Sequence, residues 1–600
     1  MSGVRVPDSP PLSFLLQPLS LVLGIASSHD ASACLFRDGQ LVAAIAEERL
    51  TRVKCDGGRL PQLAIDYVLA AANASRRDVD VVATIYGHFP EAYFRRETPA
   101  KELERIIARA VRGVTGKEKA TNFSSSNLLK HLRAHGGTFD AHFRRERFLE
   151  GEGFRPDTRV DFFDHHLTHA AAAAFYCGAD EAAIITLDGE GDLDMHYTAS
   201  TWRDGRLQRV RLADTPGNSP GFFYETITKL LGFTPNRHEG KVLGLAAMGD
   251  PRPLLPAMRR ALRASDDGRG FDSDFAGQPN AYDLRASYLE SVVKGQKREA
   301  VAAATQQALE DAVLPVCRSF LAECGLRRLA LNGGVFANVK LNQRLAALPE
   351  VESLFVFPGM SDTGNSIGAA LLSLDSQRGW MGRHRRSLED VYWGPAYEPE
   401  GIHAELMERG LQAERLGPDV LIERAAQAIH AGEVVGWFQG RMEFGPRALG
   451  NRSMLARATD AGINQSLNAR LSRTEFMPFA PSCLAEHAAT VFLGVEKAAH
   501  AAEFMTVTFD VHPQWRSRVP AVVHVDGTAR PQLVRRDRNP RYWQLIERYR
   551  QLSGIPLVLN TSFNVHEEPI VCSPAEALTA YVDGRIDCLA IGDFWLGPRR

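Results

Sequence analysis

The 600-residue chain lacks several features that would place it in a specialised class of protein. Its eight cysteines are scattered and form no Cys-x-x-Cys pair, which argues against structural zinc modules and a disulfide framework. The formal net charge is −2, so no excess of positive charge points to nucleic acid or to a membrane surface. The composition favours a cytoplasmic protein with two or more globular domains.

Long apolar runs are also missing, because no stretch is both long and apolar enough to span a bilayer. The run LSFLLQPLSLVLGIA near the N-terminus has the look of a signal peptide. Gln17 and Pro18 interrupt it, however, and only Arg5 supplies basic charge before it. We therefore interpret this run as a buried β-strand.

Strand and turn patterns predict a mixed α/β protein. Residues 21–48 contain two β-rich runs joined by Asp38-Gly39, which is a hairpin signal. Residues 327–345 and 353–374 each follow the order of a strand, a loop and a helix. These alternating elements are typical of a sheet covered by helices.

Charged and irregular segments divide the chain further. Residues 89–150 are rich in arginine, lysine and glutamate, with apolar residues at helical spacing, and we predict a helical insertion there. Residues 376–400 are polar and irregular, which predicts a linker. A second α/β region follows, with strands near 433–438 and 556–560. We place the domain boundary between residues 395 and 396, giving domains 1–395 and 396–600.

Residues 164–176 read DHHLTHAAAAAFY, with three histidines before an alanine-rich helix. His165 and His169 are four residues apart, so on a helix they share one face and can bind one divalent metal. His166 points about 100° away and is the weaker candidate. No glutamate follows the first histidine, so the His-Glu-x-x-His motif of metalloproteases is absent. A solvated histidine cluster remains the alternative, and a third metal ligand must come from elsewhere in the chain.

Three glycine-bearing turns follow buried strands: Gly24 with SSHDAS, then DGEGD, then NGGVFAN. Backbone N–H groups in such turns, and at the helix starts after them, can cradle phosphates. One such turn is weak evidence, but three in one region predict nucleotide binding.

Taken in order, HDASA, EERLTRVK, HHLTHAAAA, LDGEGD, HEGKVLGLAAMG, NGGVFANVKLN and PGMSDTGNSIGAA resemble the nucleotide-dependent carbamoyltransferases. That family includes the O-carbamoyltransferases of antibiotic and nodulation-factor biosynthesis. The resemblance implies an actin-like (ASKHA-type) ATPase domain followed by a YrdC-like α/β domain. The second domain shows matching motifs: GRMEFGPRALGNRS, SRTEFMPFAPS, HVDGTARPQ and NTSFNVHEEPIV.

The resemblance assigns the metal and catalytic groups of the first domain. It implies a divalent metal on His165, His169 and Asp362, with iron as the first expectation and zinc or magnesium as alternatives. The alternative for Asp362 is to cap the helix that follows it, and both roles can hold together. Asp188 is expected at the end of a strand, facing metal or phosphate, although a plain turn aspartate is the alternative.

Further residues of the first domain are expected to act on the carbamoyl group and the nucleotide. His29 could accept a proton from the acceptor hydroxyl or hold the carbamoyl group. Lys54 resembles the family lysine that faces the nucleotide phosphates. Nucleotide contacts are also expected from Lys241, Gly333, Gly334 and Asn338.

The second domain is expected to bind carbamoyl phosphate, because planar guanidinium groups hold phosphate and carbamoyl oxygens with paired hydrogen bonds. The resemblance then implies that carbamate passes to the first domain, attacks ATP to form carbamoyl adenylate, and reaches a small-molecule hydroxyl acceptor. The residues expected to bind carbamoyl phosphate are Arg441, Arg447, Arg473, Arg530, Asn560 and Ser562.

Two departures and two alternatives accompany this reading. Leu471 and Ser472 stand where YrdC-like domains usually have a lysine, so Arg470 could supply that charge, and Glu567 stands where the family often has glycine. A protein-carbamoylating enzyme would carry Cys-x-x-Cys zinc fingers, which are absent. A tRNA-modifying ATPase would need a basic surface, and the near-neutral charge speaks against it. We expect no nucleic-acid or membrane partner, and a homodimer stays open.

Overall fold

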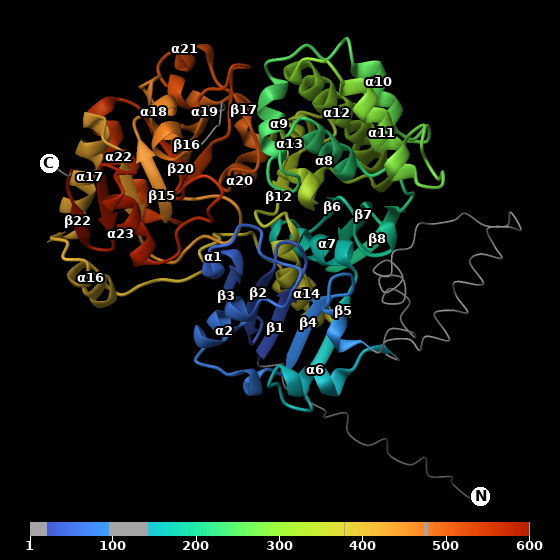
Figure 1. Ribbon diagram of the computed structural model, residues 1–600, viewed down its shortest axis with the longest axis horizontal. Coiled ribbons are helices and arrows are strands. Elements are labelled where there is room, and N and C mark those ends of the chain that lie inside the picture. The colour runs from blue at the N-terminus through green and yellow to red at the C-terminus, as the bar shows by residue number, and fades with distance from the viewer. Residues whose placement is uncertain (1–20, 95–141, 377–378, 473–477, 599–600) are drawn as a thin grey trace, which may run out of the picture.

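The computed structural model describes residues 21–94, 142–376, 379–472 and 478–598 (Figure 1). The predicted helical insertion over 89–150 lies largely outside these residues. Its described ends contain the short helices η2 (Glu91–Tyr93) and α6 (Arg145–Gly151). Arg473 also lies outside the described residues.

The first sheet has five strands in the order β3-β2-β1-β4-β5. Its first three strands run antiparallel, whereas β4 and β5 run parallel to β1. Asp38 and Gly39 both have positive φ, as a tight hairpin turn requires, and they join β2 to β3 as predicted. The strands are β1 (Leu21–Ala26), β2 (Ser32–Arg37), β3 (Gln40–Ala46), β4 (Val81–Ile85) and β5 (Arg159–Phe163).

The second sheet repeats this topology in the order β8-β7-β6-β11-β12. Again the first three strands are antiparallel, and the last two run parallel to the first. Two sheets with one strand order are the doubled unit of the predicted actin-like fold. The strands are β6 (Ala182–Leu187), β7 (Tyr197–Arg203), β8 (Arg206–Ala213), β11 (Arg328–Asn332) and β12 (Ser353–Val356).

Two buried helices pack against each other between these sheets: α7 (His165–Tyr176) and α14 (Asn365–Asp375). The α14 helix lies on β1 and β4, whereas α7 lies on β6 and β11. Small residues permit this close approach, because a Cβ on Gly368 would lie 2.0 Å from the Thr168 carbonyl oxygen. The alanines of α7 are fully buried in the same contact. Each helix starts at the site described below.

A layer of helices covers the second sheet (green in Figure 1). The longest of them, α12 (Arg298–Cys324), packs against α8, α9, α10 and α13. The other helices of this region and of the first sheet are α1 (Glu48–Thr51), α2 (Gln62–Ala70), α8 (Pro220–Leu230), α9 (Glu239–Ala246), α10 (Leu255–Ala261), α11 (Ala281–Val293) and α13 (Val339–Ala346).

The C-terminal region is built on a mixed eight-stranded sheet in the order β13-β22-β21-β14-β15-β20-β16-β19. The strands predicted near 433–438 and 556–560 are β14 (Val435–Phe438) and β20 (Leu557–Ser562). The other strands are β13 (Glu414–Arg415), β15 (Arg452–Ala456), β16 (Ala480–Leu484), β19 (Gln532–Val534), β21 (Cys588–Ile591) and β22 (Phe594–Leu596). Its helices include α16 (Pro399–Glu408), α17 (Pro418–Ala431), α18 (Ile463–Arg470), α22 (Pro540–Ser553) and α23 (Pro574–Val582).

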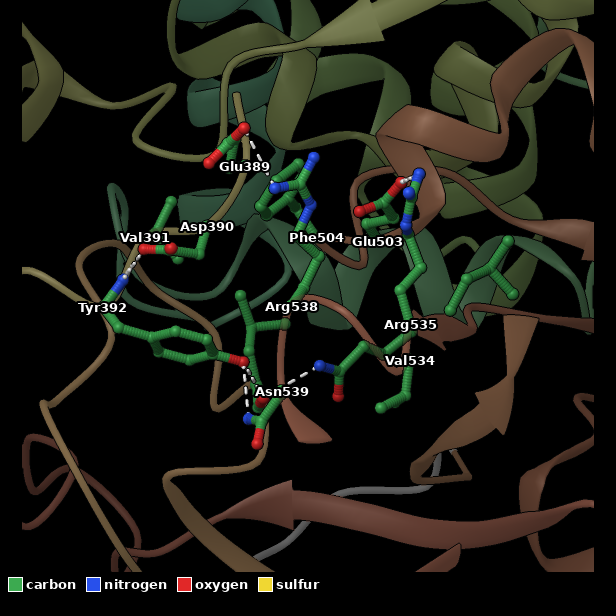
Figure 2. A pocket seen from close by; sticks show the side chains of 13 residues that line it. Glu389, Asp390, Val391, Tyr392, Glu503, Phe504, Val534, Arg535, Arg538 and Asn539 are labelled. Carbon is green, nitrogen blue, oxygen red and sulfur yellow. Dashed lines mark hydrogen bonds and ion pairs between the residues drawn. The ribbon is translucent and has the colours of Figure 1, made fainter. Parts of the chain in front are cut away.

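The predicted linker is largely irregular between α15 (Trp380–His384) and α16, and it packs against the C-terminal region. Figure 2 shows residues 389–392 lining a pocket with residues 503–504, 534–535 and 538–539. The Asn539 amide donates to the Tyr392 hydroxyl at 2.8 Å, and Arg538 pairs with Glu389 at 3.0 Å. The domain boundary at 395 remains a prediction. No helix of the described residues is long and apolar enough to cross a membrane.

Candidate functional site

Helix α7 brings His165 and His169 together, as their spacing predicts. Asp164 caps the helix by accepting a hydrogen bond from the Leu167 N–H at 2.8 Å, and it also pairs with Arg209. One turn separates the two histidines, and their Nε2 atoms lie 3.2 Å apart. Both side chains are buried.

Two carboxylates complete this cluster. Asp188 follows β6, and Asp362 lies just before α14. The His169 Nε2 atom is 3.2 Å from Asp188 Oδ2 and 3.6 Å from Asp362 Oδ1. The His165 Nε2 atom lies 3.4 Å from Asp362 Oδ1 and 3.6 Å from Asp188 Oδ2. The sequence placed Asp188 among the catalytic groups, and the structure adds it to the predicted three-residue set as a fourth donor.

The geometry of this set fits a divalent cation. Metal bonds of about 2.1 Å place tetrahedral donors about 3.4 Å apart, which matches the observed distances. Carboxylates raise the pKa of His165 to about 9, although burial alone would lower it, so the site favours positive charge. The Nδ1 atoms of both histidines are buried and have no partner among the described residues. With the proton on Nδ1, each Nε2 lone pair is free for a metal.

The capping alternative for Asp362 finds no support. Helix α14 begins at Asn365, its N-cap residue is Gly364, and no side chain caps it. Asp362 instead uses one oxygen for each side of the site. Its Oδ1 atom faces the histidines of α7, and its Oδ2 atom lies 3.2 Å from His29 Nδ1.

His29 lies at the mouth of the cluster, in the loop after β1. Its side chain is about half exposed, at 46%, and its Nε2 atom lies 3.6 Å from Asp30. Burial would lower the pKa of this imidazole, but Asp362 and Asp30 outweigh that effect and raise it to about 10. Through its contact with Asp362, His29 therefore joins the buried cluster to solvent.

His166 faces away from the cluster, as the helical spacing predicts. Its Nδ1 atom accepts from the Thr186 hydroxyl at 2.7 Å, and its Nε2 atom donates to the Met195 carbonyl oxygen at 3.0 Å. Burial holds the pKa of His166 well below its usual range. Its role is to join α7 to the second sheet.

The NGG turn after β11 presses directly on the cluster. The Gly334 N–H donates to Asp188 Oδ2 at 3.2 Å. Gly333 has a φ of +101°, and a Cβ there would lie 2.2 Å from the Leu187 carbonyl oxygen, so this position requires glycine. Asn332 donates to the His169 carbonyl oxygen at 2.8 Å. The turn thus holds the helix and the carboxylate in one arrangement.

The remaining predicted nucleotide residues lie at different depths. Asn338 caps α13 by accepting from the Leu341 N–H, so its side chain has a structural role. Lys241 is largely buried, with its ammonium 6.0 Å from the centre of the Phe233 ring. Lys54 is partly exposed, and its carbonyl oxygen accepts from Arg237 at 2.8 Å.

Residues that the sequence did not single out also contribute. Asp192 accepts a hydrogen bond from the His165 N–H at 2.8 Å, and its signal was available as the last residue of DGEGD. The His88 ring lies 6.3 Å from that of His165. It follows β4 in the segment YGHFP, where no motif marks it.

In the C-terminal region, the amide of Asn560 is the centre of a buried network. Its Nδ2 atom, with two N–H donors, lies 2.9 Å from the Ser482 hydroxyl oxygen, 3.1 Å from Gln532 Oε1 and 3.1 Å from the Ala448 carbonyl oxygen. Ser482 and Gln532 were not predicted, although Gln532 ends the HVDGTARPQ motif. Ser562 donates to Asn564 at 2.6 Å.

Three of the predicted arginines of this region lie among the described residues: Arg441, Arg447 and Arg530. Arg441 donates to the backbone carbonyl oxygens of Val42, Trp393 and Gly394. Arg447 and Arg530 are partly exposed. Arg441 therefore joins the C-terminal region to the linker and the first sheet.

Other arginines extend this junction. Arg49 and Arg52 belong to the EERLTRVK motif of the first half. Arg49 donates to the Gly445 carbonyl oxygen at 2.9 Å, and Arg52 donates to Pro569 and Ile570 at 2.7 and 2.8 Å. The motif thus serves to attach the two halves of the chain.

Comparisons with known proteins give the same result for the N-terminal and C-terminal parts of the chain. The family model described as Carbamoyltransferase N-terminus matches residues 21–371, and Carbamoyltransferase C-terminus matches residues 426–597. The nodulation protein NolNO of Sinorhizobium fredii is 35% identical over 97% of this chain and 80% of its own length. The nodulation protein NolO of Bradyrhizobium diazoefficiens is 34% identical over 73% of this chain and 79% of its own length. Among solved structures, HypF of T. kodakarensis is 13% identical over 60% of this chain and 48% of its own, with a TM-score of 0.30.

Proposed function

The chain belongs to the carbamoyltransferase family and is a carbamoyltransferase enzyme, and from this premise we propose a specific reaction. It takes the carbamoyl group from carbamoyl phosphate, activates it with ATP, and transfers it to a hydroxyl of a small-molecule natural product such as an antibiotic precursor. The observation that carries the proposal is the buried cluster of His165, His169, Asp188 and Asp362 beside the NGG turn. The free thiols of all eight cysteines support a cytoplasmic location.

The cluster supports a metal-assisted nucleotide site. His165, His169, Asp188 and Asp362 would hold a divalent metal, with imidazoles favouring iron or zinc over magnesium. When bound, the cation supplies positive charge that neutralises phosphate oxygens. Gly333 and Gly334 leave their backbone beside Asp188, where a nucleotide can approach closely.

The chain's own residues would then act around that site. Lys54 and Lys241 would neutralise the negative charge of the ATP phosphates. His29 stands at the half-exposed mouth, where its imidazole, kept protonated by Asp362 and Asp30, can donate a hydrogen bond that holds the carbamoyl group. The activated carbamoyl group would need shielding from water at this site, because water hydrolyses it.

The C-terminal region would bind carbamoyl phosphate through Arg447, Arg530 and Asn560, together with Ser562 and Arg473. Water cleaves the carbamoyl phosphate there to carbamate and inorganic phosphate. A carbamate oxygen then attacks the α-phosphorus of ATP, forming carbamoyl adenylate and releasing pyrophosphate. Finally, the acceptor oxygen attacks the carbamoyl carbon, AMP leaves, and the hydroxyl proton passes to the departing AMP phosphate.

Mass spectrometry tests this proposal directly. The purified chain is incubated with carbamoyl phosphate and ATP, without acceptor, and we expect carbamoyl adenylate and pyrophosphate. Omitting either substrate should abolish both products. Formation of ADP in place of carbamoyl adenylate and pyrophosphate, or carbamoyl transfer without ATP, would contradict the proposed adenylation.

A further inference from the structure

A second cluster of ionisable groups lies where the loop after β20 meets the segment before α9. The His238 Nε2 atom lies 2.6 Å from Glu567 Oε1, and Arg237 Nη1 lies 3.4 Å from Glu567 Oε2. His566 Nε2 is 3.6 Å from the same Oε1 atom. His238, His566 and Glu567 are close enough together to suggest a metal site.

The hydrogen bonds of His238 argue against a metal there. The backbone N–H of Thr234 donates to His238 Nδ1 at 3.1 Å, so Nδ1 carries a lone pair. The ring proton must then lie on Nε2, which donates it to Glu567. This nitrogen has no lone pair to offer a metal, so the cluster is held by hydrogen bonds and charge.

The backbone of Glu567 has a conformation that is costly for a residue with a side chain. Its φ is +62°, in the left-handed region that glycine adopts freely and other residues adopt at a cost. The contacts of the carboxylate with Arg237 and His238 offset that cost. A glutamate at this position therefore links distant segments of the chain at the cost of a strained backbone conformation.

That link reaches both proposed sites. Arg237 uses its other terminal nitrogen to donate to the Lys54 carbonyl oxygen at 2.8 Å. His238 is the N-cap residue of α9, the helix that carries Lys241. On the other side of the link is β20, which carries Asn560 and ends at Ser562. Glu567 lies five residues after that end.

We propose that Glu567 is a positioning residue that holds Arg237 and His238 in place. Through these two residues it orients Lys54 and the start of α9, and so couples the carbamoyl phosphate loop to the nucleotide site. The assignment of those sites rests on the proposed function. The mechanical link itself does not, because it consists of the contacts described above.

Hydrogen–deuterium exchange measures the link without relying on activity. The amides of His238 and Lys241 are hydrogen-bonded to backbone carbonyls, which makes their exchange a readout of local order. In Glu567→Gly we expect exchange over residues 234–241 to rise by about threefold to tenfold, as for loss of partly exposed ionic contacts. The same substitution suits the backbone, so its unfolding midpoint should stay equal or rise.

Two further variants make the measurement specific. Glu567→Gln keeps an acceptor for His238 and should retain most of the protection. Glu568→Gln alters the neighbouring exposed glutamate, which pairs with Arg585 at 3.5 Å, and should leave exchange over 234–241 unchanged. Unchanged exchange in Glu567→Gly would overturn the proposal. An equal rise in exchange in Glu567→Gly and Glu568→Gln would overturn it as well.

Kinetics and metal titration complete the test. We expect Glu567→Gly to raise the KM for ATP by about threefold to tenfold while phosphate release from carbamoyl phosphate stays unchanged. If the wild-type chain shows no ATP-dependent transfer, the proposed function fails, but exchange still decides the positioning role. Zinc titrated into a His165→Ala/His169→Ala variant should find no tight site, and tight binding that Glu567→Gly abolishes would overturn the assignment in favour of a metal.

Discussion

The histidine–aspartate cluster of the first half and the predicted arginine and amide residues of the C-terminal region differ in how they are built. In the cluster, side chains from α7, from the residue after β6 and from the segment just before α14 have donor atoms within 3.2–3.6 Å of one another. In the C-terminal region, Asn560 sits in an amide network, whereas Arg441 reaches away to three backbone carbonyl oxygens. The difference teaches that a motif specifies partners well when the side chain is short and its element rigid. A long arginine has many acceptors within reach.

The two regions also differ in the sign of the charge that they would accept. One buried and one partly buried carboxylate, together with two imidazoles, favour a cation, whereas arginines and amides favour an anion. This contrast matches a division of labour in which one region handles the nucleotide and its metal, and the other handles carbamoyl phosphate. Four changes would break or sharpen that division.

The largest expected effect comes from removing a donor of the cluster. His169→Ala should lose the bound metal and lower carbamoyl transfer by at least about a hundredfold, since even outer partners of metal ligands cost 10–100-fold. Elemental analysis and the transfer assay measure the two effects. His430→Ala, on the exposed end of α17, is the matched control and should keep both. Full metal content and activity in His169→Ala would remove the cluster from the mechanism.

A smaller effect is expected from the anion-binding side. Arg530→Ala should slow phosphate release from carbamoyl phosphate by roughly tenfold to more than a hundredfold, because a charge-assisted contact contributes about 1.5–3 kcal/mol. ATP affinity should stay the same, since the change lies in the other region. Arg536→Ala, an exposed arginine nearby, serves as the control. Equal losses of ATP binding and phosphate release would argue against two separate sites.

Arg441 separates structural from ligand-binding arginines. Arg441→Ala should lower the free energy of unfolding by about 2 kcal/mol, because it leaves partly buried carbonyl oxygens without their charged donor. Urea denaturation compares it with Arg530→Ala, which we expect to change stability by less than Arg441→Ala does. An Arg441→Ala chain that is fully stable but fails to cleave carbamoyl phosphate would place this arginine in the binding site.

The smallest effect concerns a buried histidine outside the carboxylate cluster. Burial lowers the pKa of His196 to about 4, in contrast to the raised pKa of His165. As the pH is lowered, His196 therefore binds a proton in the unfolded chain before it does so in the folded chain. The free energy of unfolding decreases as the pH drops below about 6.5.

Between pH 7.5 and 5.5 this residue should cost about 1.4 kcal/mol. Urea denaturation at both pH values measures the loss, and His196→Gln should show a correspondingly smaller one because glutamine does not titrate. Identical pH dependence in both chains would show that His196 is accessible to protons in the folded state.

Much of the site could be predicted because local rules apply to it. The four-residue spacing brings His165 and His169 to one face, and the Asp38-Gly39 pair marks the hairpin turn. Resemblance to a family supplied Asp362 and the doubled actin-like architecture. Asp188 was recognised, but its membership in the donor set was not, because a strand end alone does not say which helix it faces.

By itself, the sequence determined the helices, the turns and the chemistry available at each motif, since these depend on neighbours a few residues away. Only the tertiary structure decided which of those groups meet. Asp188 and Asp362 are far apart in the chain, yet the repeated sheets and the close packing of α7 on α14 bring both beside the same two histidines. It also assigned Arg49, Arg52 and Arg441 to the junction between the halves. The physical reason is that partners are chosen by distance in space and by competing acceptors, which no local spacing encodes.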